Sequence, residues 1–302
     1  MRIGFVGLGK MGSQIVQKLL SEEHEIVVTD VSEDAIKASV SMGAIGAKSP
    51  EELISLLPGR PVVWLMIPDT FVGETVATYR ELLPPGSILI DGGNSFFRDT
   101  IERGKTLADK QIDYLDVGTS GGIMGLANGF SLMVGGKSDA VSYIEPILDV
   151  LARPHGGYTH LGPSGSGHYV KMVHNGVEYG MMQAYAEGYD LLRYGPVENL
   201  DLAAIAKVWQ QGSIVSSTLN QLTSEILEQN PELDGIDGYV ADSGEGRWTK
   251  ETAQTSKIPT PALDAALHVR QDSQNGNVYF ATKLLAAMRN KFGGHVINKP
   301  RD

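Results

Sequence analysis

The sequence predicts an α/β protein: a doubly wound domain with a mostly parallel sheet, then an all-α domain, with one long helix between the two domains. Three observations predict this fold. Short apolar strands alternate with helical patterns from residue 2 to about residue 151, which is typical of a sheet covered by helices on both faces. A stretch rich in Gly and Pro at 153–167 interrupts this pattern. Only helical patterns follow, so we expect domains at 1–160 and 161–302.

The elements of the first domain follow from their apolar patterns. RIGFV at 2–6 is a short buried strand, and EIVVTD at 25–30 is a second one. PVVWLMIP, SILIDGGN and DYLDVGTSGG continue the series, and FSLMVGG closes it. Strands are therefore expected at 2–6, 25–30, 61–68, 87–94, 113–122 and 130–136, with helices at 32–43, 70–83, 97–110 and 138–151.

The second half shows helical periodicity and no further strand alternation. GIDGYVADSGEGRWTK at 235–250 is a Gly-rich interruption, and INKPRD at the end is expected to be a loose tail. Helices are expected at 165–194, 199–209, 215–228, 259–272 and 276–291. We expect this all-helical domain to bind substrate and to form the contacts between subunits.

A glycine fingerprint follows the first strand. GLGKMG places glycines at positions 7, 9 and 12, a helical pattern follows, and the second strand ends in Asp30. Strand, glycine turn, helix, strand and an acid about 20 residues on form the context of a dinucleotide-binding Rossmann fold. The helix N-terminus offers N–H groups and a positive dipole end to the pyrophosphate. The expected cofactor-binding residues are Gly7, Leu8, Gly9, Lys10, Met11, Gly12, Asp30, Met66 and Asn94.

Asp30 indicates which nicotinamide cofactor is used. A carboxylate at this position binds both ribose hydroxyls of NAD and repels a 2′-phosphate. Val31 and Ser32 follow it and supply no positive charge for that phosphate. The sequence therefore favours NAD, with NADP as a weaker substitute.

Composition excludes several classes of function. The chain of 302 residues contains no cysteine, which rules out disulfides, thiolate catalysis and cysteine-ligated zinc. Its formal net charge of −11 argues against nucleic acid as a partner. No stretch approaches 18 uninterrupted apolar residues, so no membrane span is expected. MRIGFVGLGKMG does not resemble a signal peptide, and we expect a cytoplasmic protein.

A polar stripe marks the first helix of the second domain. Lys171, His174, Asn175, Glu178 and Tyr179 are spaced at i, i+3, i+4, i+7 and i+8, so they share one helical face. A polar stripe is usually the solvent face of a helix. Here the segment 168–189 carries only three full charges, which indicates a buried helix whose charges need a function. Such a face supplies a base, an acid and hydrogen-bonding groups for proton transfer.

Taken together, these motifs resemble one enzyme family. GLGKMG, DGGNS at 91–95, SGGIMG at 120–125 and KMVHNGVEYG at 171–180 resemble 6-phosphogluconate dehydrogenase of the pentose phosphate pathway. The resemblance spans almost the whole chain and is to the shorter members, whose helical domain is not duplicated. GxGxxG, SGG and the pair Lys171 and Asn175 are shared with the wider β-hydroxyacid dehydrogenases.

The resemblance implies roles for the site residues. Lys171 would be the general base that removes the proton of the substrate C3 hydroxyl as hydride leaves for the nicotinamide. Glu178 would be the general acid that protonates C1 after loss of carbon dioxide, which releases ribulose 5-phosphate. No divalent metal is implied. The residues implied to hold the sugar acid and the nicotinamide end are Asn94, Ser120, Gly121, Gly122, His174 and Asn175, with Tyr179 on the phosphate.

The rest of the second domain would supply phosphate binders. GEGRWT at 244–249 resembles the family's GTGKWT, with Arg247 in place of the usual Lys. Arg270 lies where the family places an arginine for the phosphate. RNKFGGH at 289–295 resembles RDYFGAH, in which the Arg and His reach a neighbouring subunit. Arg289 and His295 would then make the site depend on a homodimer or homotetramer.

Two alternatives remain open at this point. Another β-hydroxyacid dehydrogenase, acting on unphosphorylated 3-hydroxyisobutyrate or tartronate semialdehyde, would keep Lys171 and Asn175 but has no use for three phosphate-binding arginines. A non-catalytic NAD-binding sensor needs neither Lys171 nor Glu178. The sequence favours an NAD-dependent, decarboxylating 6-phosphogluconate dehydrogenase that acts on a small phosphorylated sugar acid.

Overall fold

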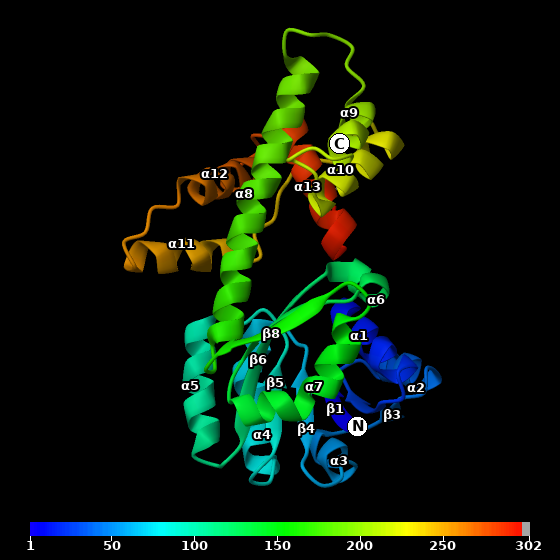
Figure 1. The fold of residues 1–302 in the computed structure, drawn as a ribbon, viewed down its shortest axis with the longest axis vertical. Helices are drawn as coiled ribbons and strands as arrows, with labels where there is room; N and C mark the ends of the chain where they lie inside the picture. Colours follow the sequence, from blue (N-terminus) through cyan, green and yellow to red (C-terminus); the bar gives the residue numbers. More distant parts are fainter. Residues whose placement is uncertain (298–302) are drawn as a thin grey trace. The chain divides into compact units, whose positions relative to one another are not determined.

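The computed structural model describes residues 1–297 and divides the chain into two compact units. The first unit is Met1–Met172 and the second begins at Val173. Helix α8 (Ser166–Tyr194) is continuous across this division (Figure 1). The domain boundary expected at residues 160–161 stays a prediction. The tail expected at 297–302 lies, apart from Ile297, outside the described residues.

The first unit contains an eight-stranded sheet in the order β3-β2-β1-β4-β5-β6-β7-β8. Adjacent strands pair in parallel except β6 and β7, which are antiparallel. The expected doubly wound architecture is therefore confirmed. The strands are β1 (Arg2–Val6), β2 (Glu25–Thr29), β3 (Ile45–Gly46), β4 (Val62–Leu65), β5 (Ile88–Asp91), β6 (Asp113–Ser120), β7 (Ser131–Gly135) and β8 (Gly157–Gly162).

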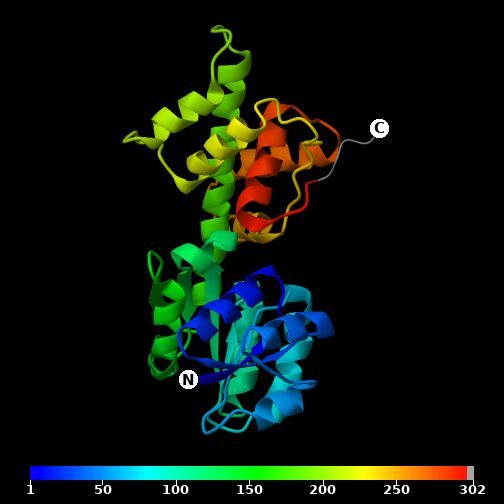
Figure 2. The ribbon, with the colours of Figure 1, turned by 90° about the vertical axis from the view of Figure 1, so that its right-hand side faces the viewer.

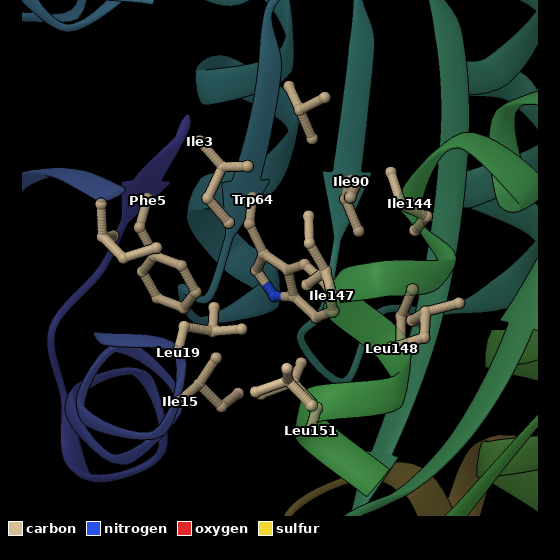
Figure 3. Close-up of a cluster of buried hydrophobic side chains, with 14 of the residues drawn as sticks. Ile3, Phe5, Ile15, Leu19, Trp64, Ile90, Ile144, Ile147, Leu148 and Leu151 are labelled. Atoms are coloured by element: carbon tan, nitrogen blue, oxygen red, sulfur yellow. The ribbon is translucent and has the colours of Figure 1, made fainter. Parts of the chain in front are cut away.

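Alternating side chains of the central strands form two cores, one on each face of the sheet. Ile3 and Phe5 of β1 pack with Trp64 of β4 and Ile90 of β5 on one face (Figure 3). Helices α1 (Lys10–Ser21) and α7 (Ser138–Ala152) cover this face. Val63 and the other alternate residues pack on the opposite face against α3 (Pro50–Ser55), α4 (Asp69–Leu82) and α5 (Phe97–Ala108). Burial on both faces explains why these strands are continuous apolar runs.

Four short elements of this unit were not expected. β3 has two residues, η1 (Gly122–Met124) is a single 3-10 turn, and the small helices α3 and α6 (Gly125–Asn128) are shorter than two turns. β8 lies within the segment 153–167, where the Gly- and Pro-rich sequence predicts an interruption and no strand, so that prediction was wrong. Its side chains are mostly exposed and it pairs with β7 alone, because it is the edge strand of the sheet. Helix α2 (Glu33–Ser41) was expected.

All the regular secondary structure in the described residues of the second unit is helical, and loops connect the helices (Figure 2). Its core forms around Met182, Ala186 and Tyr189 of α8, with Leu284 and Met288 of the last helix. Helix α11 occupies part of the Gly-rich stretch at 235–250, where no helix was expected. None of the described helices is both long and apolar enough to cross a bilayer. The helices after α8 are α9 (Leu202–Gln210), α10 (Thr218–Gln229), α11 (Glu245–Thr255), α12 (Pro261–Gln274) and α13 (Phe280–Gly293).

Candidate active site

The sequence-predicted cofactor residues lie along one edge of the sheet. β2, β1, β4, β5 and β6 are neighbours in that order and are all parallel. Their carboxyl ends therefore meet at the same edge, which is where such sheets bind ligands. The residues at or just after these ends are Asp30, the loop from Gly7 to Gly12, Met66, Asn94, and Ser120 with Gly121 and Gly122.

The fingerprint loop has the close approaches that a pyrophosphate site requires. A Cβ at Gly7 would stand 2.3 Å from the Met66 carbonyl oxygen, and one at Gly12 would stand 2.1 Å from the Gly7 carbonyl oxygen. At Gly9, by contrast, a Cβ would meet nothing within 4 Å. Gly9 is also the N-cap of α1, which has no side-chain cap and no acid in its first turn. The loop therefore leaves space and N–H donors for an anion, and it fits a dinucleotide.

Asp30 ties the fingerprint loop to the end of β2. Its Oδ2 accepts a hydrogen bond from Leu8 N at 2.5 Å, and its Oδ1 accepts one from Ser32 N at 2.8 Å. Glu33 and Asp34 add two carboxylates in the first turn of α2, and Lys37 pairs with both of them. The charge beside the ribose position is therefore negative. Such a site suits a ribose diol and opposes a 2′-phosphate.

Replacing Asp30 with Ser is expected to raise the ratio of NADP to NAD activity, because the charge that repels a 2′-phosphate is lost. Activity with NAD itself should fall, since the carboxylate also accepts the Leu8 N–H. The measurement is kcat/KM with each cofactor. Asp34→Ser, an exposed acid nearby, is the matched control and should change the ratio less. An unchanged ratio in Asp30→Ser would place cofactor choice elsewhere.

The loop after β5 is organised by Asp91, a fully buried carboxylate. Its Oδ1 accepts a hydrogen bond from Gly93 N at 3.1 Å, and its Oδ2 accepts one from Ser95 Oγ at 2.7 Å. Tyr114 OH also donates to Oδ2 at 3.2 Å, and burial raises the pKa of Tyr114, so it remains a donor at neutral pH. Asp91 thus holds Gly93 and Ser95, the two neighbours of Asn94, and so fixes the backbone at Asn94, which is itself exposed.

Lys171 lies against the end of β6. A Cβ at Gly118 would stand 2.4 Å from the Lys171 Cβ, so only glycine allows this approach. Ser120 ends the same strand two residues later. Lys171 is only 7% exposed, so its side chain is largely shielded from solvent. The first unit thus brings Lys171 and Ser120 to the same strand end.

The next two turns of α8 present the remaining polar residues of the stripe. Asn175 and Tyr179 are buried, and the side chains of His174 and Glu178 are 37% and 24% exposed. His174 Nδ1 lies 3.1 Å from Asn175 Oδ1 and 3.9 Å from Glu178 Oε2. Because α8 is continuous, Glu178 stands about 10 Å along its axis from Lys171, two turns away on the same face. A base and an acid at this spacing can serve the two ends of a short substrate.

Arg270 is buried in the second unit, and this could not be expected of an arginine on an amphipathic helix. It is 1% exposed, and its guanidinium lies 3.5 Å from the centroid of the Tyr179 ring. Its Nη1 donates to the Ala241 carbonyl oxygen at 3.2 Å. Burial, together with the nearby charge of Arg289, lowers the pKa of Arg270 to about 10, so it stays protonated at neutral pH. A buried cation of this kind is suited to bind an anion.

The other candidate phosphate binders differ in setting. Arg289 is 5% exposed in α13 and lies in the same unit as Arg270. Arg247 is largely exposed and its Nε lies 2.6 Å from Asp242 Oδ2. Asp242 Oδ1 also accepts a hydrogen bond from Tyr179 OH at 3.4 Å, so one acid links the Arg247 loop to α8. His295 is exposed just after α13.

Sequence reasoning missed two buried acids, Asp91 and Asp116. Asp91 ends an otherwise apolar strand and Asp116 lies between the buried Leu115 and Val117, and each acid holds a loop or helix end that carries a candidate site residue. A carboxylate directly beside buried apolar strand residues was the available signal, because buried charges occur where they have partners. Their partners, however, come from distant segments and are visible only in the structure.

The fold and these residues define a class: nicotinamide-dependent dehydrogenases with a Rossmann unit followed by a helical unit. Comparisons with known proteins define the family. Residues 2–162 match the NAD binding domain of 6-phosphogluconate dehydrogenase, and residues 167–289 match the C-terminal domain of the same enzyme. The chain belongs to the 6-phosphogluconate dehydrogenase family.

Individual relatives agree with this assignment. The NAD(+)-dependent, decarboxylating 6-phosphogluconate dehydrogenase of Haloferax volcanii is 39% identical over 307 residues, which cover 100% of both chains. Plasmodium falciparum 6-phosphogluconate dehydrogenase has been studied in complex with NADP+ and with 6-phosphogluconate. Its structure is 30% identical in sequence, with a TM-score of 0.83, and covers 95% of this chain and 70% of that one. The structure of Mycobacterium tuberculosis 3-hydroxyisobutyrate dehydrogenase is 20% identical, with a TM-score of 0.72, and covers 94% of this chain and 97% of that one. This likeness shows a shared fold alone.

Proposed function

We propose that the protein catalyses the oxidative decarboxylation of 6-phosphogluconate to ribulose 5-phosphate and carbon dioxide, with NAD as the oxidant. Family membership supports this activity, and the acidic cluster at Asp30, Glu33 and Asp34 supports NAD over NADP. The observation that carries the substrate class is Arg270, a fully buried cation stacked on Tyr179. An unphosphorylated hydroxyacid has only the carboxylate at its reacting end and would give this costly buried charge no second anion to bind.

The chemistry uses two proton-transfer groups on α8. NAD, when bound at the glycine loop, supplies the hydride acceptor. Lys171, as a neutral amine, accepts the proton of the C3 hydroxyl while hydride leaves C3, which gives a β-keto acid. Carbon dioxide then leaves, and the lysine ammonium returns a proton to the oxygen of the resulting enediolate. Glu178 donates a proton to C1 of the enediol while the neutral Lys171 takes the proton of the C2 hydroxyl, and this leaves the ketone of ribulose 5-phosphate.

One assay separates this function from its alternatives. The enzyme is mixed with 6-phosphogluconate and either NAD or NADP, and reduced nicotinamide and carbon dioxide are followed together. Equal yields of both products, with higher kcat/KM for NAD, are expected. Reduced nicotinamide without carbon dioxide would indicate another β-hydroxyacid dehydrogenase. Tight NAD binding without any turnover would indicate a sensor.

We also propose that the chain acts as a homodimer or homotetramer. Val177, Met181, Ala184 and Leu191 follow a spacing of four, three and seven residues on α8 and are exposed. An exposed apolar stripe of this kind favours association with another helix. Of the two residues expected to reach a neighbour's site, His295 is exposed, whereas Arg289 is buried beside Arg270 in its own unit. We therefore assign His295 to the shared contact, and Arg289 to the anion site of its own chain. A cytoplasmic location stays a prediction from the cysteine-free sequence.

Sedimentation tests the oligomer. The wild-type protein is expected at two or four times the chain mass of 32.5 kDa. Met181→Glu places a charge in the apolar stripe and is expected to shift the protein toward monomer, because a buried unpaired carboxylate is costly. Glu187→Gln, an exposed position on the same helix, is the control. A wild-type monomer would contradict the proposal.

A further inference from the structure

Asp116 is a fully buried carboxylate in β6 that the reaction outlined above does not use. Both of its oxygens accept hydrogen bonds from the start of α8. Gly165 N donates to Oδ1 at 2.7 Å, and His168 N donates to Oδ2 at 2.9 Å. The first N–H groups of a helix have no partner within the helix. Asp116 therefore caps α8 from a strand about fifty residues earlier in the chain.

Two further contacts fix the same turn of α8. The His168 ring is buried, and its Nδ1 is hydrogen-bonded to Thr100 Oγ1 of α5 at 2.8 Å. A Cβ at Gly167 would stand 2.2 Å from the Met133 carbonyl oxygen of β7. The helix start is thus pressed directly onto the backbone of the sheet, and a residue with a side chain could not approach as closely. The turn has little room to shift.

Lys171 follows His168 by three residues, less than one helical turn later. β6 therefore acts on Lys171 at two points. Gly118 contacts the stem of the lysine, and Asp116, two residues earlier, holds the helix end that precedes it. An α-helix fixes the rise and rotation between neighbouring residues. The place of the Lys171 amine consequently depends on how the helix start is held.

We propose that Asp116 is the positioning residue of the general base, because its carboxylate docks the first turn of α8 on β6 and so sets where the Lys171 amine stands. A carboxylate suits this task. It makes stronger hydrogen bonds to N–H groups than a neutral acceptor, and its charge complements the positive end of the helix dipole. The inference rests on the role proposed for Lys171.

Asp116→Asn tests the proposal with almost no change in size. The amide keeps one oxygen, so one of the two backbone N–H groups loses its acceptor and the helix start is held less tightly. A misplacement of about 1 Å can cost roughly 100-fold in rate. We expect kcat to fall about 10- to 100-fold, with little change in NAD affinity. Asp113→Asn, on the same strand but paired with Arg60 and Lys137 outside the core, is the matched control and should retain the wild-type rate.

A double-mutant cycle separates positioning from a general loss of structure. If Asp116 acts through Lys171, Asp116→Asn should lower the residual kcat of Lys171→Ala by less than about twofold, because the group it positions is already gone. The same fold loss in both backgrounds would overturn the inference, as would a near-wild-type kcat in Asp116→Asn. Full activity in Lys171→Ala would overturn the proposed base itself. Asp116→Ser, which keeps one hydroxyl acceptor, replaces Asp116→Asn in the cycle if the latter does not fold.

Discussion

Replacing Lys171 with Ala is expected to lower kcat by about 10²–10⁴-fold, the usual contribution of a positioned general base. The variant keeps the Cβ that packs against Gly118, so the contact between β6 and α8 should persist. NAD affinity should change little, because the glycine loop and Asp30 are untouched. The measurement is the steady-state rate of NADH formation at saturating 6-phosphogluconate, with NAD binding followed separately by fluorescence or calorimetry.

Lys110→Ala is the control for this change. Lys110 is an exposed lysine of the same unit, paired with Glu81, and its removal should leave kcat unchanged. A further check uses small primary amines, which can enter the space left by the lysine side chain and restore part of the rate of Lys171→Ala. A rate within a few-fold of wild type without added amine would remove Lys171 from the role of base.

Replacing Arg270 with Gln is expected to raise the KM for 6-phosphogluconate by about 10- to 100-fold, with a smaller change in kcat. Hydrogen bonds to charged groups contribute about 1.5–3 kcal/mol, and a bidentate contact between guanidinium and phosphate lies at the strong end of that range. Gln keeps much of the side-chain volume beside Tyr179 but removes the charge. The measurement is initial rate against substrate concentration at saturating NAD.

Two other arginines supply the comparison. Arg193→Gln removes a partly buried charge that pairs with Glu232 in the same unit and should leave KM unchanged. Arg247→Gln removes a largely exposed guanidinium that Asp242 already pairs with, and we expect an intermediate increase in KM. If Arg270→Gln leaves KM within about twofold of wild type, the buried guanidinium is structural and the phosphate binds elsewhere.

The sequence predicted correctly those elements whose own residues form an apolar pattern that indicates burial. β1, β4 and β5 are apolar on both faces because helices cover both sides of the sheet. The glycines at 7 and 12 predicted the fingerprint loop. In the structure, a side chain at either position would come too close to a backbone oxygen. Such local patterns do not need knowledge of distant partners.

The elements that the sequence missed depend on partners elsewhere in the chain. β8 is an exposed edge strand, so it lacks the apolar alternation that marks a strand in sequence. α11 is a polar helix in a Gly-rich stretch, and tertiary contacts account for its glycine. A Cβ at Gly246 would stand 2.5 Å from the Tyr179 ring, and one at Gly176 of α8 would stand 2.7 Å from Thr249 Cγ2. Those glycines permit helix packing, although in sequence they look like helix breakers.

The candidate site, like the fold, has features that the sequence predicts and features that only the structure shows. The sequence by itself determined that Lys171, Asn175 and Glu178 share one helical face, because helical periodicity fixes that relation before the chain folds. Only the tertiary structure decided that Arg270 is a buried cation stacked on Tyr179, and that Asp116 caps the helix that carries Lys171. Burial and charge pairing depend on which distant segments come together, and that information lies in the packing of the whole chain and not in any single stretch of it.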